Sequence, residues 1–359
     1  MAGALALLAT PARAGERQKI ERSIIAATTR NRDGSYAAVL YDLDKGLLDA
    51  ANLPARGHDV AINPITRGCV AFARRPGTFA ISFGVQKERP PIVFHTPANR
   101  HFYGHGIFSP DGRLLYTTEN DFENGQGIIG VWDVMAGYKR IGELLAHGIG
   151  PHDINLLGDG QTLVIANGGI VTHPDHGRRP LNLATMSPSL TYIDCATGDL
   201  LEQQKLPGDM QQRSIRHLDV GANGTVIFGC QFKGARSEIV DLVGFHQRGK
   251  SVELLSGGPT IHRALRHYVS SVAVDRSGAF CGITSSRGQQ LVIVDVAKRQ
   301  VIATHEFADV SGIAASVRPG SFVVASGDGG LAIADRARIL PTGEAPPWSW
   351  DNHAIALPT

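Results

Sequence analysis

Five histidines stand at the start of short apolar segments and are the residues of this chain best placed to do chemistry. Three of them, His58, His105 and His152, follow one another at intervals of 47 residues. His217 and His353 open two further segments of the same kind. Neutral imidazole is the commonest transition-metal ligand in proteins, so histidines that converge in the fold would offer a site for Fe, Cu or Zn.

Three interpretations of these histidines are open from the sequence. The imidazoles bind a metal ion, or they hydrogen-bond the backbone of a neighbouring repeat together with the acids Asp59, Asp153 and Asp219. In the third interpretation, histidines and arginines form a cradle for a carboxylate or an anionic metal chelate, because arginine can donate two parallel hydrogen bonds to such a group. The first and third interpretations both predict a ligand site.

The histidines recur because the chain is built from repeats. Each unit has an apolar segment, a turn containing Gly, and then second and third apolar segments, as in 105–118 and 152–166. Further units begin near residues 58, 217, 270 and 313. The seventh unit is split, because 23–29 and 37–43 have the pattern of second and third segments, and 353–357 has the pattern of the missing first one.

The repeat length predicts the fold. About 340 residues divided over seven units give roughly 48 residues each, the length of a four-stranded propeller blade. We therefore predict an all-β, seven-bladed β-propeller as a single domain over residues 20–359, with its first blade closed by the C-terminal strand. Sharing one blade between the two ends removes exposed sheet edges. The long amphipathic segments that a doubly wound α/β fold needs are missing.

This architecture predicts where the candidate residues meet. The innermost strands of a propeller line a central channel and start on one face, so the five histidines are expected at one channel mouth. The equivalent positions of the other two units lie near Ser271 and Ile313. The loops between second and third strands reach the same face, together with an insertion at 168–189. These loops supply the candidate ligand-binding residues Arg30, Arg74, Glu119, Asn167, Lys233 and Arg287.

Composition excludes several classes of function. A formal net charge of +2 and a charged fraction of 19% provide no basic surface of the kind that duplex nucleic acid needs. The sequence has no apolar stretch of the roughly 18 residues that span a bilayer. It also lacks a phosphate-binding P-loop, a C-x-x-C-H haem attachment, an H-E-x-x-H motif and a G-x-S-x-G elbow. We therefore expect no nucleic acid partner, no membrane span, no nucleotide and no covalent haem.

Residues 1–14 have the pattern of a signal-peptide remnant. An apolar run at 2–9 is followed by a proline and by the small-x-small pair Ala12 and Ala14, so the predicted cleavage follows Ala14. No basic residue precedes the run, and we expect an upstream basic or twin-arginine segment that a late start codon has left out. The expected compartment is the periplasm. The four cysteines lie in or at the end of separate apolar runs, which predicts free thiols rather than disulfides.

Four motifs in the repeats resemble those of a known family. They are His58-Asp59, Tyr103-Gly104-His105-Gly106-Ile107-Phe108-Ser109-Pro110-Asp111-Gly112, Gly150-Pro151-His152-Asp153 and Arg216-His217-Leu218-Asp219. With them, nearly the whole mature chain resembles an uncharacterised bacterial family of exported seven-bladed β-propellers in the YVTN/quinoprotein-like superfamily. Its members are commonly encoded beside imelysin-type iron-regulated proteins, which implies imelysin-type partners and a role in periplasmic iron acquisition. The family has no established catalytic residues, so the resemblance implies none.

The residues predict a periplasmic propeller that binds a metal ion, a metal chelate or another anion at a His- and Arg-rich channel mouth, and the resemblance implies that it is an accessory to iron acquisition. The alternative is a metal-dependent enzyme at the same mouth, such as a lactonase-like hydrolase or an oxidoreductase. Lactonase-type propellers hold calcium with Asp, Glu and Asn oxygens. A mouth dominated by His and Arg favours a softer metal or an anion instead.

Overall fold

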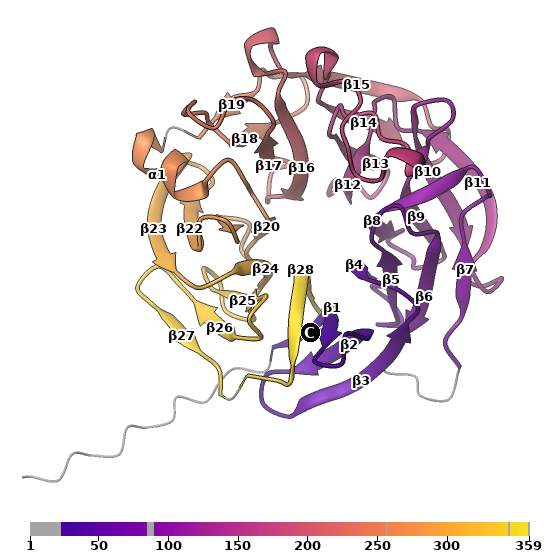
Figure 1. Ribbon diagram of the computed structural model, residues 1–359, viewed down its shortest axis with the longest axis horizontal. Coiled ribbons are helices and arrows are strands. Elements are labelled where there is room, and N and C mark those ends of the chain that lie inside the picture. The colour runs from indigo at the N-terminus through magenta and orange to yellow at the C-terminus, as the bar shows by residue number, and fades with distance from the viewer. Residues whose placement is uncertain (1–22, 85–89, 256, 344, 358–359) are drawn as a thin grey trace, which may run out of the picture.

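Seven four-stranded antiparallel sheets form a ring around a central axis, which confirms the predicted seven-bladed β-propeller (Figure 1). The computed structural model describes residues 23–84, 90–255, 257–343 and 345–357. The predicted signal remnant 1–14, with its cleavage after Ala14, and the start of the predicted domain at residue 20 lie outside these ranges.

Each blade has four strands, in the following order from the channel outward. Blade 1 contains β28 (Trp348–Ala356), β1 (Ile24–Asn31), β2 (Tyr36–Asp42) and β3 (Gly46–Leu53). Blade 2 contains β4 (Gly57–Ile62), β5 (Cys69–Ala73), β6 (Phe79–Phe83) and β7 (Val93–His95). Blade 3 contains β8 (Arg100–Phe108), β9 (Leu114–Asp121), β10 (Gln126–Asp133) and β11 (Lys139–Leu145).

The remaining four blades follow the same plan. Blade 4 contains β12 (Pro151–Leu156), β13 (Thr162–Asn167), β14 (Ser189–Asp194) and β15 (Leu200–Lys205). Blade 5 contains β16 (Arg213–Val220), β17 (Val226–Phe232), β18 (Val243–His246) and β19 (Glu253–Leu254). Blade 6 contains β20 (Ser271–Val274), β21 (Phe280–Ser285), β22 (Gln290–Asp295) and β23 (Gln300–Glu306). Blade 7 contains β24 (Val310–Ala315), β25 (Phe322–Ser326), β26 (Leu331–Ala334) and β27 (Ile339–Pro341).

Burial follows the position of a strand within its blade. The second strands β5, β13 and β25 are buried along their whole length, because neighbouring blades cover both of their faces. The outermost strands β11, β15 and β23 are partly exposed. This gradient explains why second strands read as continuous apolar runs in the sequence.

The first blade is closed by the C-terminal strand, as predicted. In Figure 1 the yellow β28 lies beside the indigo β1. The two strands pair antiparallel, with Ile25 opposite Ala356 and Ala27 opposite Ala354. A hydrogen bond from the Trp350 Nε1–H to the carbonyl of Gly329 also ties β28 to blade 7.

Seven equivalent hydrogen bonds join the innermost strand of every blade to the second strand and fix their register; their donors are called hairpin donors, although in blade 1 the two strands are β28 and β1. In each, a backbone N–H just after the innermost strand donates to a carbonyl at or just before the start of the second strand, at 2.8–3.0 Å. The donors are Asn63, Ser109, Leu157, Gly221, Asp275, Ser316 and Leu357. Residues at the same distance before these donors are therefore structurally equivalent.

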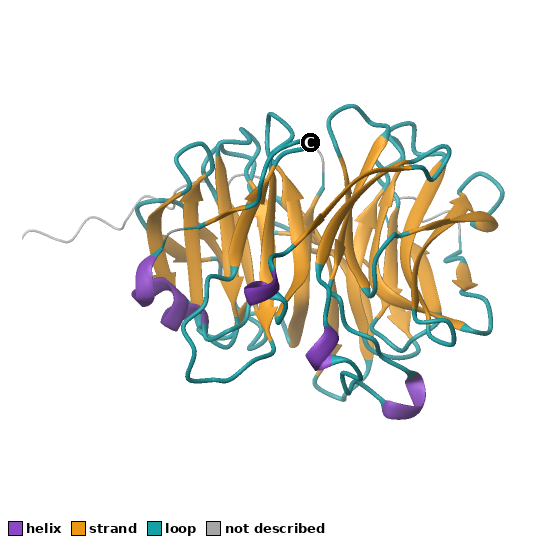
Figure 2. Cartoon of the chain, turned by 90° about the horizontal axis from the view of Figure 1, so that it is seen from above, coloured by secondary structure: helices purple, strands orange, loops and turns teal. Residues whose placement is uncertain are grey.

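Helical segments gather on one face of the ring. They are η1 (Pro174–His176), η2 (Leu183–Thr185), η3 (Gly208–Met210) and α1 (Gly258–Leu265). Figure 2 shows them on the face opposite the C-terminal end of the chain, where the innermost strand β28 finishes. They therefore lie on the face where the innermost strands start. None of the helices in the described ranges is long and apolar enough to span a membrane. The four cysteines are free thiols, as predicted.

Candidate functional site

The structure brings the five histidines His58, His105, His152, His217 and His353 together at the centre of the ring. Contacting rings have centroids between 4.6 and 5.7 Å apart. Each side chain is buried, with between 2% and 7% of its residue exposed. These five residues are called the histidine ring below.

The histidine ring is built from two layers rather than one. His58 and His152 lie five residues before the hairpin donor of their blade, whereas His105, His217 and His353 lie four residues before theirs. The first layer faces the mouth, where the cavity lining includes His58, His152, Arg216 and Asn352, all five residues before a donor, and His217. The second layer faces the other end of the channel, where the lining includes Asp59, His105, Asp153, Ser271 and His353, all four residues before a donor.

The two units without a histidine need one correction. Ser271 lies four residues before its donor, as predicted, and its Oγ is 3.1 Å from Nδ1 of His353. In blade 7, however, the equivalent residues are Ser311 and Gly312 rather than Ile313. The register of β24 shifts between Val310 and Gly312, as that of β12 and β16 does at the equivalent residues, so these two positions lie just before the apolar run that begins at Ile313.

Aspartates rather than histidines join the backbones of neighbouring blades. Oδ2 of Asp153 accepts a hydrogen bond from the N–H of Leu218 in the next blade, at 3.1 Å. Oδ2 of Asp219 accepts one from the N–H of Val274, also one blade further on, at 2.7 Å. The interpretation in which side chains hydrogen-bond the backbone of a neighbouring repeat therefore holds for Asp153 and Asp219 rather than for the histidines beside them.

His105 is held by two carboxylates. Its Nδ1 lies 2.9 Å from Oδ2 of Asp59 and 3.3 Å from Oδ1 of Asp153, which occupy the same layer in the two flanking blades. An Nδ1–H that donates to carboxylate fixes the ring and leaves Nε2 as a basic nitrogen, the arrangement found around metal-ligating histidines. His105 is therefore oriented as a ligand.

Each of the five imidazoles has a buried ring nitrogen with no hydrogen-bond partner among the described residues. These atoms are Nδ1 of His58, His152 and His217, and Nε2 of His105 and His353. A buried polar atom without a partner costs about 1–3 kcal/mol, so five in one place are unusual for a structural core. Candidate ligand atoms fall into two triads, His58/His105/His353 and His105/His152/His217, each with all atoms within 4.8 Å of one another.

Four of the ring histidines are neutral near pH 7. Burial, followed by repulsion from nearby imidazoles or arginines, holds the pKa of His58, His152, His217 and His353 well below the ordinary value. Burial also disfavours charge on His105, but the carboxylates of Asp153 and Asp59 outweigh it and raise that pKa. A metal ion binds the neutral form of imidazole, so these four rings need not release a proton first.

The metal-free protein is expected to lose stability as the pH falls from 7 to 5. Below about pH 6.5 the four neutral histidines take up protons on unfolding that the folded state excludes, so acid favours the unfolded state. His105 acts in the opposite direction because its pKa is raised, as do Asp153 and Asp219, whose pKa burial raises to about 6. His101 and His246, whose pKa burial also lowers, act with the four ring histidines. Glu119 and Asp309, whose pKa burial raises, act with the opposing three. Six groups that take up protons on unfolding thus oppose five that release them. Urea titrations should therefore give a smaller free energy of unfolding at pH 5, and an equal or larger value would contradict the expectation.

Gly104 makes room for the ring. It occupies the mouth-side layer in blade 3, and its φ is +112°, in the region that favours glycine. A Cβ at this position would lie 2.8 Å from Cβ of His58 and closer still to the imidazole. The Tyr-Gly-His order of the sequence motif therefore lets His58 pack against His105.

Replacing Gly104 by Ala is expected to displace His58 and to lower stability by about 1–3 kcal/mol from backbone strain, with the steric clash in addition. Gly125→Ala is the matched control, because Gly125 also has a positive φ, +63°, but a Cβ there meets nothing within 4 Å. Thermal unfolding of both variants separates the clash from the strain. An equal fall of melting temperature in the two variants would show that the packing of His58 does not require a glycine at position 104.

A cavity of about 410 Å³ opens above the histidine ring on the helix-bearing face. Six basic side chains line it, supplied by loops and strands of four different blades: Arg74, Arg75, Arg178, Arg216, Lys233 and Arg287. Tyr103, Tyr268, Gln231 and Asn352 add polar atoms. Among the described residues, no Asp or Glu contributes to this lining.

Three of the six predicted ligand-binding residues lie at this mouth, and three do not. Arg74, Lys233 and Arg287 line the cavity. Arg30 lines a separate pocket beside blade 1. Glu119 is fully buried and pairs with Arg140 at 2.7 Å, and Asn167 is fully buried with a hydrogen bond to Thr191 at 3.0 Å.

Three basic residues of the cavity are not among the predicted ligand-binding residues: Arg75, Arg178 and Arg216. Arg216 lies five residues before its hairpin donor, the position of His58 and His152 in their blades. Arg216 directly precedes His217 in the sequence, and this position next to a ring histidine could have indicated that it lies at the channel mouth. Arg178, on the insertion 168–189, reaches the same cavity.

Comparisons with known proteins agree with the fold. A family described as "Protein of unknown function (DUF1513)" matches residues 51–357, which contain the whole histidine ring. Among solved structures, the chain is similar to hydrazine synthase of Kuenenia stuttgartiensis, with a TM-score of 0.63 and 14% identity over 86% of this chain and 95% of that one. At this identity the likeness shows the fold alone. No curated protein matches the chain.

Proposed function

Because the chain belongs to the DUF1513 family, for which no function is described, we propose from its site that the protein binds a transition-metal ion in the histidine ring. The observation that carries the proposal is the set of five buried imidazole nitrogens without hydrogen-bond partners among the described residues, with two candidate ligand triads that share His105. Imidazole is a suitable ligand for Zn, Cu and Fe. A bound ion would satisfy several of these atoms at once.

The site has the further parts that a metal centre needs. The carboxylates of Asp59 and Asp153 orient His105. Ligand nitrogens in a tetrahedral zinc site lie about 3.3 Å apart, given bond lengths of about 2.0–2.1 Å. The atoms of each triad lie within 4.8 Å, so small rotations of the rings would bring them to that spacing.

The proposal includes a cellular role, that of a periplasmic accessory to iron acquisition. The signal-like pattern at 1–14 supports a periplasmic location, and the family resemblance supports an accessory role in iron acquisition beside imelysin-type proteins. A metal-dependent enzyme is the second candidate, favoured by the cavity of about 410 Å³ that adjoins the ring. Turnover of a lactone or of a redox dye by metal-loaded protein, and none by metal-free protein, would favour the enzyme.

The proposal is tested by elemental analysis of untagged protein purified from the periplasm, followed by thermal unfolding after metal removal. Metal-free protein is titrated with Zn²⁺, Cu²⁺ and Fe²⁺. A ligand present at 100 times its dissociation constant stabilises a fold by about 2.7 kcal/mol, so at least one ion should raise the melting temperature clearly. Protein without stoichiometric metal, and without a response to any of the three ions, would overturn the proposal.

A further inference from the structure

We propose that the basic cavity above the histidine ring binds a small oxyanion with two or more negative charges, of the polycarboxylate kind that chelates metal ions. The pairing of this anion with the ring metal rests on the proposed function. Anion binding itself does not, because it depends on the basic side chains alone.

The charge of the cavity is not neutralised by the protein. Six basic groups line a volume of about 410 Å³, and none of the six forms an ion pair with a carboxylate in the part of the chain that the structure describes. Lys233 contacts the amide oxygen of Gln231 at 3.2 Å, and the guanidinium of Arg287 lies 4.4 Å from the ring centroid of Tyr268. Neither contact supplies a formal negative charge. An anion in the cavity would supply it.

Two buried polar atoms at the cavity have no hydrogen-bond partner in the described part of the chain. Arg216 is 4% exposed and Tyr103 is 1% exposed, and both line the cavity. Within the described residues, Nε of Arg216 and Nε of Arg74 make no hydrogen bond. Groups of this kind are stabilised by a ligand that accepts hydrogen bonds, as the oxygens of carboxylates and phosphates do.

Mutual repulsion also shows in the acid–base behaviour of these groups. Burial, together with repulsion from Arg216 and Arg287, lowers the pKa of Lys233 to about 7. An anion beside Lys233 would oppose this lowering.

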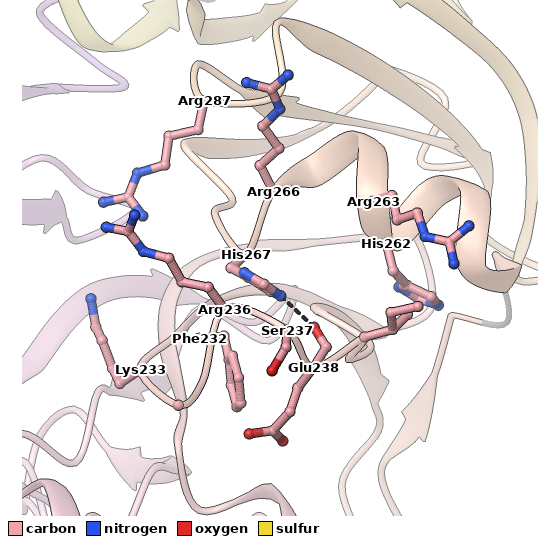
Figure 3. Close-up of a pocket in the computed structure, with 12 residues that line it drawn as sticks. Phe232, Lys233, Arg236, Ser237, Glu238, His262, Arg263, Arg266, His267 and Arg287 are labelled. Carbon is pink, nitrogen blue, oxygen red and sulfur yellow. Dashed lines mark hydrogen bonds between the residues drawn. The ribbon is translucent and has the colours of Figure 1, made fainter.

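Basic side chains continue outward from the mouth into a side pocket of about 1010 Å³, which shares Lys233 and Arg287 with the cavity. Figure 3 shows the charged ends of Lys233, Arg236 and Arg287 gathered on one side of this pocket. Opposite charge attracts a ligand along such a path and speeds its association. The side pocket therefore provides an approach for an anion from solvent.

The same charges explain why the metal should arrive with an anion. A bare divalent ion beside the mouth-side layer would meet the repulsion of six basic groups. A chelate with a net negative charge would instead be attracted, with its metal toward the imidazoles and its carboxylates toward the arginines. The cavity volume lies within the 300–1,000 Å³ range of small-molecule sites.

The test is calorimetric titration of metal-free protein with citrate, phosphate and acetate at constant ionic strength. Metal is removed with a chelating resin, because a soluble chelator is itself a polyanion. Citrate should bind, and acetate should bind far more weakly. Arg178→Gln should weaken citrate binding, and Arg74→Gln/Arg178→Gln should weaken it by at least about tenfold, because each substitution removes a charged hydrogen-bond donor. Arg179→Gln is the matched control, because Arg179 adjoins Arg178 and is exposed like it, but does not line the cavity.

The affinities of wild type and variants for citrate and phosphate decide whether the cavity is an anion site and which anion it prefers. Citrate binding that depends on Arg178 and not on Arg179 supports it, and tighter binding of citrate than of phosphate supports a polycarboxylate. Tighter phosphate binding would keep the anion site and reject the chelate. Lack of binding by either anion at millimolar concentration, or equal binding by all variants, would overturn the proposal even if the ring binds Zn²⁺. Absence of Zn²⁺ binding with intact citrate binding would count against the proposed function alone.

Discussion

Deletion of residues 352–359 is expected to destabilise the folded protein severely. The deletion removes the end of β28, including the residues that pair with Ile25, Ala26 and Ala27 in β1. It leaves two sheet edges open at the gap in the ring, and such edges pair with other chains. The truncated chain should aggregate or unfold cooperatively at a much lower temperature, as measured by soluble yield and thermal unfolding.

A circular permutant provides the control for this deletion. The N–H of Leu357 donates to the carbonyl of Ile24 at 2.8 Å, so a short turn can join the end of β28 to the start of β1. Placing residues 347–357 ahead of residue 23 restores every strand of blade 1 without the C-terminal location. The permutant should fold. Normal yield and an unchanged melting temperature for the truncated chain would refute closure by β28.

Replacing His105 and His152 together by Gln is expected to abolish metal binding. His105 belongs to both triads, and His152 belongs to one, so no complete triad remains. The amide that replaces the His105 imidazole can still donate to Asp59 and Asp153, which limits the effect on folding. The rise of melting temperature with metal should therefore disappear in the double variant, and metal retained after gel filtration should fall to the background level.

His173→Gln/His176→Gln is the matched control for the ring variant. Both residues lie on the insertion, outside the described metal triads, and His176 is exposed. This control should bind metal as the wild type does. If the ring variant instead loses much stability and neither the wild type nor the variant responds to metal, the histidines are structural.

The fold was predictable because each blade repeats the same local signals. Apolar segments of strand length, separated by Gly-containing turns, recur at a nearly constant interval. The split blade was also visible, because 23–29 and 37–43 lack a first segment. What the apolar pattern does not contain is register. The equal spacing of His58, His105 and His152 hid the fact that His105 lies one position nearer its hairpin donor than the other two.

The loop predictions depended on where each second strand ends. Arg74, Lys233 and Arg287 follow the last residues of β5, β17 and β21, and they line the mouth. Arg30, Glu119 and Asn167 lie within β1, β9 and β13, because these strands extend further than the apolar runs suggested. A side chain inside a strand points into the layers between blades, whereas a side chain just after the strand can reach the channel mouth. For a polar residue near a strand end, the sequence does not show which of these two places it takes.

The location of His353 has a consequence for the order of assembly. This residue lies on β28, and β28 pairs with a strand more than 300 residues earlier in the chain. Contacts of such long sequence separation form late, because the intervening chain must first be brought together. The triad that contains His353 thus exists only once β28 has been synthesised and has paired with β1. A metal ion held there would link β28 to β4 and β8 of the next two blades, so metal release and opening of the first blade would be reciprocal events.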